Sequence, residues 1–458
     1  MILKRKAYQE LLNWKMHSNG NSALLLIGAR QVGKSFLAKL FGKNEYKSMI
    51  TIDFADVSNE VLCIFENDAI NLDAVENASA NLDAFFSKLS LHYDTPLYKW
   101  ESLIVFDEIQ LYPKARQLLR HLVADGRYDF IATDSFLSAQ TNIQDIAVLS
   151  GQEEKLELCP LSFEEFLNAI GDDFTYPYLK LCFENRKPLG QALHKRVLND
   201  FRQYLLVGGM PQPVAEFAKE KNYETSDQVK KCILERYRDD IAESADSYSH
   251  KVSAIYDLLP DQLAKKEKKF AFSSIGKGVR FRNCKNALMW LSDWGSVNIC
   301  SNAADPNAGL FPSNDHLTRK LYMADTGLLV SHAFGDKQYM DNNLYLDILL
   351  DNYFVYDGML MENVVAQMLR SSGHDLLFYS RTDANSRQDI MDIDFLILRN
   401  GVICPVEVKP SSNRANSSLD KFRRKFESNL GTPYVLYTKD VMEKGGVVHL
   451  PIYMTGLL

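Results

Sequence analysis

A glycine-rich loop between an apolar run and a helical stretch constrains the fold of this chain more than any other feature. Residues 23–41 read ALLLIGARQVGKSFLAKLF, so the spacing GxxxxGKS begins at Gly28, directly after the apolar run, and ends at Ser35. In such a loop, backbone N–H groups wrap phosphate oxygens at the N-terminus of the following helix, which requires a strand before the loop and a helix after it. The segment therefore predicts a parallel α/β sheet that binds a nucleoside triphosphate.

The residue types of this loop fit ATP together with magnesium. Gly28 and Gly33 let the backbone approach the phosphates. Lys34 is expected to pair with the β- and γ-phosphates, and Ser35 is expected to ligate Mg²⁺. The predicted nucleotide contacts extend along the whole loop: Gly28, Ala29, Arg30, Gln31, Val32, Gly33, Lys34, Ser35 and Phe36.

Two later runs end in residues that fit the same site. SLIVFDEIQ places Asp107 and Glu108 at the end of an apolar strand. Asp107 suits the second ligand sphere of the magnesium, and Glu108 suits a general base that polarises the attacking water. The alternative for Glu108 is a solvated carboxylate at a strand end. In FIATDSF, Thr133 or Ser135 is expected to contact the γ-phosphate. With these residues the chain is predicted to hydrolyse ATP.

Between residues 22 and 158, short apolar runs alternate with helical stretches, as in a parallel sheet. The runs lie at 23–27, 49–54, 103–106, 130–132 and 156–158. We expect an ATPase-type core at 1–165.

The remaining chain divides by its patterning. Residues 161–246 have apolar positions three and four apart, which predicts helices. The next stretch has helices followed by two β-like runs at 297–300 and 321–323, as in a winged helix, and the last part reads as α+β. The expected parts are a helical lid or connector at 166–249, a winged-helix-like domain at 250–335 and an α+β domain at 340–458.

Five motifs together resemble a widespread bacterial and archaeal family of AAA-type P-loop ATPases whose members carry a C-terminal domain of unknown function. The motifs are GARQVGKS, FDEIQLYP, CPLSFEEFL, VGGMP and KLYMADTGLL. The resemblance spans nearly the whole chain. It implies an ATPase core of the ASCE or AAA type, a helical lid, a winged helix and a nuclease-like tail.

Two departures from the family pattern bear on hydrolysis. Where the family usually reads TGSS, this chain has Thr133, Asp134 and Ser135, so a carboxylate lies near the expected phosphates. Where the family usually reads GR, this chain has Gly151 and Gln152, so an arginine contact is missing. Hydrolysis is then expected to be slow, or to need an arginine from a neighbouring subunit of a homo-oligomer. The candidates are Arg116, Arg120 and Arg127.

A second group of charges lies on a predicted hairpin. The segment MDIDFLILRNGVICPVEVK has a two-residue Asn-Gly turn signal at 400–401, typical of a type I′ hairpin. The register of such a turn pairs Asp394 with Glu407 and Asp392 with Lys409, so the charges gather at one end of the hairpin. Two carboxylates about 5 Å apart repel by roughly 3 kcal/mol at an effective dielectric constant near 20, so a cation is expected between them. Magnesium is the obvious candidate.

This arrangement resembles the PD-(D/E)xK nuclease fold, also called the restriction-endonuclease-like fold. The resemblance implies that Asp394 and Glu407 hold a second Mg²⁺ or Mn²⁺, and that Glu407 and Lys409 take part in activating water. The family supplies one more carboxylate from a helix, and Glu362 in GMLMENVVAQML matches that place. The predicted metal ligands of the chain are therefore Ser35, Asp107, Glu362, Asp394 and Glu407.

The alternative for the hairpin is a fold that binds without cutting. Lys409 and nearby Arg381 or Arg387 would then neutralise the acids, and no metal would be needed. The sequence leaves cleavage and binding alone both open.

A basic stretch also bears on partners. Residues 265–285 hold eight Lys or Arg against one Glu, in a chain with a formal net charge of -7. The stretch overlaps the expected winged helix, so DNA or RNA is a candidate partner. The alternative is a solvated lysine run on a domain that serves as a lid or an oligomer contact.

Cysteine spacing and hydropathy limit the classes of protein to which this chain can belong. Seven cysteines lie without CxxC or Cys/His ligand spacing, which argues against a disulfide framework or a zinc site. No apolar window suits a signal peptide or a membrane span, so a cytoplasmic protein without membrane contact is expected. The leading hypothesis is an ATP-hydrolysing switch whose nucleotide state governs a DNA-binding or DNA-cleaving tail. The alternative is a regulatory switch with a degenerate nuclease fold that does not cut.

Overall fold

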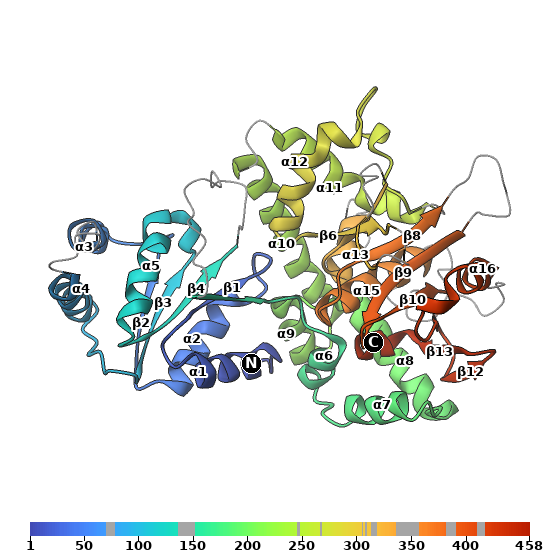
Figure 1. The fold of residues 1–458 in the computed structure, drawn as a ribbon, viewed down its shortest axis with the longest axis horizontal. Helices are drawn as coiled ribbons and strands as arrows, with labels where there is room; N and C mark the ends of the chain where they lie inside the picture. Colours follow the sequence, from blue (N-terminus) through green and yellow to red (C-terminus); the bar gives the residue numbers. More distant parts are fainter. Residues whose placement is uncertain are drawn as a thin grey trace. The chain divides into compact units, whose positions relative to one another are not determined.

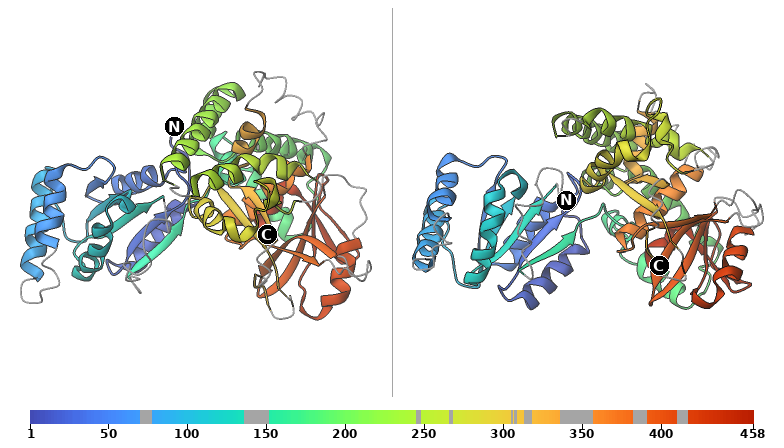
Figure 2. Two further views of the ribbon diagram at one scale, coloured as in Figure 1. Left: turned by 90° about the horizontal axis from the view of Figure 1, so that it is seen from above. Right: turned by 45° about the horizontal axis from the view of Figure 1, so that its top comes forward.

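The computed structural model of the chain is shown in Figure 1 and, from two further directions, in Figure 2. It describes residues 1–69, 78–135, 152–244, 248–265, 268–304, 306, 309–312, 318–335, 357–381, 391–409 and 417–458. The chain forms two compact units. The N-terminal unit holds Lys4–Leu158 with Asp293–Gly295, and the C-terminal unit holds Met1–Leu3, Cys159–Ser292 and Ser296–Leu458.

The N-terminal unit is built on a five-stranded parallel sheet. Its strands are β1 (Ala23–Ile27), β2 (Ser48–Asp53), β3 (Ser102–Asp107), β4 (Asp129–Asp134) and β5 (Glu153–Glu157). They lie in the order β2-β3-β4-β1-β5, and each paired strand is parallel to its neighbour. The predicted parallel sheet is confirmed. The strand order places the end of β4 between those of β1 and β3, so residues from the three strand ends can meet.

Both faces of this sheet are covered by helices (Figure 1). These helices are α1 (Ala7–Ser18), α2 (Lys34–Glu45), α3 (Asn59–Ala69), α4 (Ala78–His92) and α5 (Pro113–Asp125). Side chains alternate along β1, as in any strand. Leu24 and Leu26 join a buried cluster with Trp14 of α1, whereas Leu25 joins a second cluster with Phe106 and with residues of α3, α4 and α5. The sheet is therefore apolar on both sides, and polar chemistry is confined to the strand ends.

Helices dominate the first half of the C-terminal unit. They are α6 (Phe163–Ala169), α7 (Thr175–Glu184), α8 (Gln191–Val207), α9 (Pro211–Glu220), α10 (Tyr223–Ser244), α11 (Ser249–Ala264) and α12 (Phe281–Asp293). The predicted helical pattern is confirmed over the described residues 161–244. Helix α6 begins at a capping box, in which Ser162 and Glu165 satisfy each other's backbone N–H groups.

The second half of the C-terminal unit is a mixed eight-stranded sheet. Its strands are β6 (Val297–Asn302), β7 (Arg319–Met323), β8 (Leu377–Arg381), β9 (Met391–Arg399), β10 (Val402–Val408), β11 (Tyr434–Tyr437), β12 (Met442–Lys444) and β13 (Val447–Pro451). Their order is β12-β13-β11-β10-β9-β8-β6-β7. The helices that accompany them are α13 (Thr326–Phe334), α15 (Asp357–Ser371) and α16 (Ser417–Phe426).

The ribbon expected as the wing of a winged helix belongs to this larger sheet. Strands β6 and β7 pair antiparallel, as the sequence suggested. The other edge of β6 pairs with β8, where Ser301 lies beside Leu377. Described strands of the parts expected at 250–335 and 340–458 therefore lie in one sheet, and the winged helix stays a prediction. The apolar pattern of a strand does not reveal which neighbour its free edge will join.

The hairpin of β9 and β10 has the predicted register over the residues that pair, which stop short of the predicted pairs Asp394–Glu407 and Asp392–Lys409. Pairing runs from Arg399 with Val402 to Phe395 with Val406, and both turn residues at 400–401 have positive φ, as a type I′ turn requires. At the charged end, the Asp394 carboxylate accepts the backbone N–H of Val408 at 2.9 Å. This carboxylate thus takes up a backbone donor next to Glu407.

Two of the family-like motifs, VGGMP and ADTGLL, interlock in the C-terminal unit. The Asp325 carboxylate accepts the backbone N–H of Gly209 at 2.5 Å and that of Leu328 at 2.9 Å. A Cβ at Gly208 would lie 2.2 Å from Asp325 Oδ1, and a Cβ at Gly327 would lie 2.4 Å from the carbonyl oxygen of Val207. The residue types of these motifs are therefore explained by close packing.

Candidate functional sites

The glycine-rich loop has the backbone that its sequence predicts. Gly28 has φ 145°, Gly33 has φ 99°, and α2 begins directly afterwards at Lys34. A Cβ at Gly28 would lie 2.3 Å from the carbonyl oxygen of Leu158. Because only glycine tolerates this backbone and this approach, the loop depends on the residue types that the motif specifies.

Lys34 lies inside the loop. Its side chain is buried, and Nζ donates hydrogen bonds to the carbonyl oxygens of Gly28 at 2.8 Å and Ala29 at 2.9 Å. Burial lowers the pKa of the Lys34 ammonium to about 8, against the attraction of Glu108 and other nearby carboxylates. A phosphate would offer this ammonium a full negative charge in place of two carbonyl dipoles.

Asp107 joins the ends of three elements. Its Oδ1 atom accepts a hydrogen bond from Ser35 Oγ at 2.7 Å and another from Thr133 Oγ1 at 2.6 Å. Its Oδ2 atom lies 3.1 Å from the ammonium of Lys39. The structure thus brings together three of the predicted nucleotide and metal residues. The Ser35 hydroxyl and the Asp107 carboxylate form an oxygen set of the kind that Mg²⁺ prefers, so the residues present fit this ion.

Lys39 is a member of this site that the sequence reasoning missed. It lies four residues after Ser35 on α2, on the same face of the helix. The spacing from the motif would have identified this lysine as a neighbour of the site. Its ammonium offsets part of the Asp107 charge.

Glu108 is held in a fixed position. Its backbone has φ 53°, a left-handed conformation that few residues other than glycine adopt, and its N–H donates to Thr133 Oγ1 at 3.0 Å. The carboxylate accepts hydrogen bonds from Ser135 Oγ at 3.2 Å and from Gln110 Nε2. Backbone strain of this kind persists where surrounding contacts support it, and it is common at functional sites.

The carboxylate of Asp134 forms an ion pair with an arginine of the same chain. Asp134 is buried, and Arg116 NH1 lies 3.5 Å from its Oδ2 atom. Arg116 NH2 also lies 3.0 Å from Oε1 of Glu153. Arg127 contacts Asp125 and another aspartate of the same unit. Arg116 and Arg127 therefore have carboxylate partners in their own chain. Gly151 lies outside the described residues.

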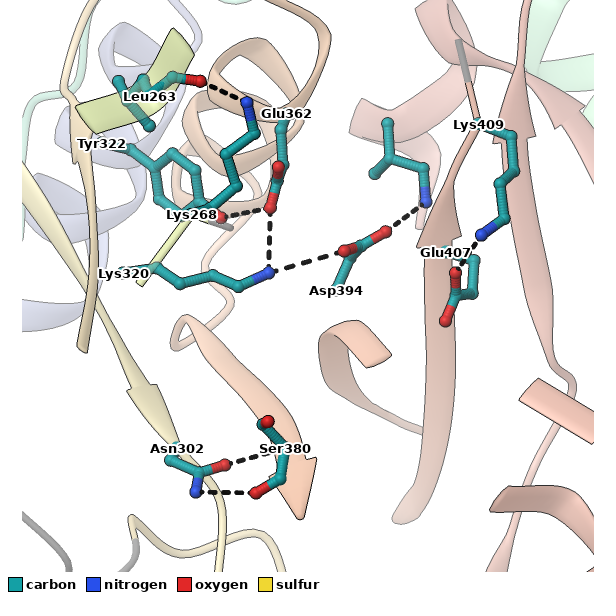
Figure 3. Close-up of polar contacts among 11 residues, drawn as sticks. Leu263, Lys268, Asn302, Lys320, Tyr322, Glu362, Ser380, Asp394, Glu407 and Lys409 are labelled. Atoms are coloured by element: carbon teal, nitrogen blue, oxygen red, sulfur yellow. Dashed lines mark hydrogen bonds and ion pairs between the residues drawn. The ribbon is translucent and has the colours of Figure 1, made fainter. Parts of the chain in front are cut away.

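The second candidate site is the carboxylate cluster of the mixed sheet (Figure 3). Glu362 lies on α15, Asp394 on β9 and Glu407 on β10. The Lys320 ammonium, which comes from β7, lies 2.9 Å from Glu362 Oε1 and 3.5 Å from Asp394 Oδ1. Lys409 Nζ lies 2.6 Å from Glu407 Oε2. The structure thus brings the predicted acids into one region, together with a lysine that the sequence reasoning missed.

Burial dominates the electrostatics of this cluster. It raises the pKa of Glu362, although Lys320 opposes the effect. Burial also raises the pKa of Glu407 to about 8, and the Asp394 charge adds to the increase. For Lys320, burial lowers the pKa, but Glu362 and Asp394 outweigh it, so the pKa lies above its ordinary value. Lys320 therefore stays charged between the two acids.

The fit of a divalent cation to these acids is poor. Two of the three predicted ligands already contact Lys320, and the third contacts Lys409. Oε1 of Glu407 is buried without a hydrogen-bond partner. Within the described parts of the chain, no group of three or more His, Cys, Asp or Glu is placed to hold a metal. Arg381 ends β8 and is exposed, and Arg387 lies outside the described residues.

The basic stretch is partly exposed. Lys268 and Lys269 are half-buried, and Lys268 Nζ donates to the carbonyl oxygen of Leu263. Residues 266–267 lie outside the described residues. The exposed basic residues of the stretch are Lys265, Lys277, Arg280, Arg282 and Lys285.

Comparison with protein families gives three matches. Residues 20–167 match an AAA domain, residues 198–338 match a domain of unknown function called DUF8612, and residues 357–454 match one called DUF4143. A search of curated proteins found no match. The N-terminal unit therefore has the fold of an AAA-type P-loop domain, and it is followed by helical and mixed-sheet parts.

Solved structures resemble the chain only distantly. A Walker-type ATPase of Pyrococcus abyssi is 14% identical with a TM-score of 0.42, covering 72% of this chain and 96% of that one. The Orc1 protein of Aeropyrum pernix, in complex with DNA, is 14% identical with a TM-score of 0.28, covering 73% and 93%. A signal transduction ATPase with numerous domains from Pyrococcus horikoshii is 10% identical with a TM-score of 0.26, covering 80% and 48%. At these TM-scores the likenesses carry no argument about function. None of the described helices combines the length and the apolar content needed to cross a membrane.

Proposed function

We propose that the N-terminal unit binds ATP with Mg²⁺ and hydrolyses it, and that its nucleotide state controls the C-terminal unit. The observation that carries the proposal is the position of Asp107, which accepts hydrogen bonds from both Ser35 and Thr133. These contacts link the start of α2 to the ends of β3 and β4. A change at the phosphates would therefore reach all three elements.

The residues of this unit have separate roles in the proposal. The backbone of the loop and Lys34 bind the phosphates, while Ser35 and Asp107 hold Mg²⁺, which offsets phosphate charge when it is bound. Glu108 orients and polarises the attacking water, since Ser135 and Gln110 hold its carboxylate in place.

Lys34→Ala tests the binding part of the proposal. The variant loses the only charged group of the loop that the structure buries against its carbonyls, so ATP affinity and phosphate release should both fall. Lys43→Ala is the matched control, because Lys43 is an exposed lysine of the same helix. Unchanged ATP affinity in Lys34→Ala, measured by fluorescence titration, would contradict the P-loop assignment.

For the C-terminal unit, nucleic acid is the proposed partner. The exposed basic residues at 277–285 carry this part of the proposal, because phosphate backbones attract such residues independently of sequence. Removing one lysine or arginine that contacts a phosphate should reduce the slope of log affinity against log salt concentration by about one. Removing Lys277 and Lys285 tests this, and Lys219→Ala, another exposed lysine of the same unit, is the control.

The internal pairing of the acids favours the version of this function that does not cut. In that version the sheet binds nucleic acid or another partner, and ATP only orders the domains. Incubation with DNA or RNA, ATP and Mg²⁺ or Mn²⁺ decides between the versions. Cleavage that disappears in Glu407→Gln would favour the nuclease, and intact nucleic acid would favour the switch. Assembly into a homo-oligomer stays a prediction.

A further inference from the structure

We propose that Lys320 is an internal counter-ion that takes the place of a divalent cation among the buried acids of the mixed sheet. While Lys320 is present, Glu362 and Asp394 bind no Mg²⁺ or Mn²⁺, and its removal opens a metal site. Lys320 lies in the C-terminal unit, whereas the ATP site lies in the N-terminal unit, so this role is separate from ATP hydrolysis.

Lys320 is placed by the sheet and by its neighbours. It pairs with Cys300 of β6, so its backbone is fixed within the sheet. Tyr322, two residues further along β7, points to the same face of the strand. The Tyr322 hydroxyl donates to Glu362 Oε1 at 2.8 Å, the same oxygen that Lys320 Nζ approaches at 2.9 Å. Two residues of one strand thus converge on one carboxylate oxygen.

Lys320 and Glu362 are both buried. The Lys320 side chain is 3% exposed and that of Glu362 is 8% exposed. Its ammonium also lies 5.3 Å from the centre of the Phe378 ring, which adds a favourable cation–π contact. Figure 3 shows the ammonium between Glu362 and Asp394, which face it from α15 and β9. Because a buried charge is costly without partners, this arrangement favours a lysine that stays in place.

A divalent cation would compete directly with this ammonium. Mg²⁺ needs a near-octahedral set of oxygen ligands at about 2.0–2.1 Å, and Mn²⁺ prefers the same kind of ligand. Lys320 occupies the space between the oxygens that such an ion would use, and two cations that close would repel strongly in a buried site. Moving Lys320 aside would leave its charge without partners inside the sheet.

The remaining acid does not provide a site on its own. Glu407 Oε2 contacts Lys409 at 2.6 Å, and Oε1 of the same carboxylate is buried without a hydrogen-bond partner. Asp394 Oδ2 already accepts the Val408 N–H at 2.9 Å. The acids of the cluster therefore behave as internally neutralised groups.

The test uses the full chain without nucleotide, carrying Asp107→Asn so that the P-loop carboxylate does not add to the metal count. Lys320→Met keeps the length of the side chain and removes its charge. Thermal unfolding is measured in EDTA and in MnCl₂, and bound Mn²⁺ is counted by electron paramagnetic resonance. The matched control is Lys268→Met, because Lys268 is a half-buried lysine near the same acids whose ammonium instead donates to the Leu263 carbonyl.

The proposal predicts that Mn²⁺ leaves the unfolding temperature of the parent chain and of Lys268→Met unchanged. Lys320→Met should unfold at a lower temperature in EDTA and regain about 5 °C or more in saturating Mn²⁺, with one additional bound ion. Adding Glu362→Gln to Lys320→Met should abolish both gains. A Lys320→Met protein that folds only when Mn²⁺ is present would support the proposal equally.

Two results would overturn it. One is Mn²⁺ binding by the parent chain that Glu362→Gln removes, since this would show a metal beside Lys320. The other is a folded Lys320→Met protein that neither binds nor responds to Mn²⁺. If Lys320→Met does not fold under any condition, the comparison of the parent chain with Glu362→Gln decides. Equal Mn²⁺ binding in the two supports the proposal, and a loss of binding contradicts it. Phosphate release from the chain with Asp107 intact reports on the ATP site separately.

Discussion

Replacing Arg116 by methionine should destabilise the N-terminal unit, because it leaves two acids without their guanidinium. Asp134 is 1% exposed and Glu153 is 7% exposed, and Arg116 lies 3.5 Å from one and 3.0 Å from the other. Removing one partner of a buried ion pair costs about 3–5 kcal/mol. The Arg116 side chain is 16% exposed. We therefore expect the lower end of that range, about 3 kcal/mol.

This loss is large enough to follow by calorimetry. For a domain of this size, a loss of 1 kcal/mol in unfolding free energy lowers the unfolding temperature by roughly 2–4 °C. Arg116→Met should therefore unfold at a temperature about 6–12 °C lower than the wild type. ATP with Mg²⁺ identifies the relevant transition, because a ligand raises the unfolding temperature of the unit that binds it. Arg120→Met is the matched control on the same helix. Arg120 is exposed, so its replacement should change stability by no more than about 0.5 kcal/mol.

A second substitution separates charge from packing. If the loss comes from the uncompensated charge of Asp134, then Asp134→Asn should restore much of the stability of Arg116→Met. If Arg116→Met is no less stable than Arg120→Met, or if Asp134→Asn restores nothing, the ion pair does not stabilise the unit. In that case Arg116 would again be a candidate for the arginine that contacts the nucleotide of a neighbouring subunit.

Two further predictions concern the C-terminal unit. Asp325→Ala removes the acceptor of the Gly209 and Leu328 N–H groups and should cost about 2–4 kcal/mol, because a helix cap is lost and a buried donor is left unsatisfied. Asp172→Ala is the comparison and should cost about 1 kcal/mol, because the more exposed Asp172 accepts the N–H groups of Phe174 and Thr175 just before α7; equal losses in denaturant unfolding would contradict the interlock at Asp325. Burial lowers the pKa of Lys230 to about 8, while an unfolded lysine holds its proton to about 10.4. Between these two pKa values the unfolded chain binds more protons than the folded chain, so the free energy of unfolding should rise with pH by roughly 2–3 kcal/mol more in the wild type than in Lys230→Met. Parallel profiles of unfolding free energy against pH for the two proteins would refute the shift.

The glycine-rich loop and the β9–β10 hairpin could be predicted from the sequence, because residues close together in the chain determine both. The loop from Gly28 to Ser35 lies between a strand and a helix because glycine spacing and apolar patterning act within a few residues. The register of the β9–β10 hairpin follows from the turn at 400–401 alone. In both cases, neighbours in the sequence decide the geometry.

Contacts between distant elements were not predictable in this way. Lys320 lies in the short strand β7, which reads RKLYM, and nothing in these neighbours shows that Glu362 and Asp394 will lie beside it. The pairing of β6 with β8 was missed for the same reason, since many strands could satisfy the free edge of a ribbon. A lysine within a buried strand is nevertheless a usable signal, because burial of its charge demands a carboxylate.

Glu108 is proposed to serve ATP hydrolysis and not ATP binding. Single-turnover phosphate release from ATP with Mg²⁺, measured together with ATP affinity, tests it in Glu108→Gln. The control is Glu101→Gln, because Glu101 is an exposed acid of the same unit. We expect Glu108→Gln to keep its ATP affinity and to release phosphate more slowly by on the order of 10²–10⁴-fold, while Glu101→Gln changes neither quantity. Release at the wild-type rate from Glu108→Gln would contradict the claim.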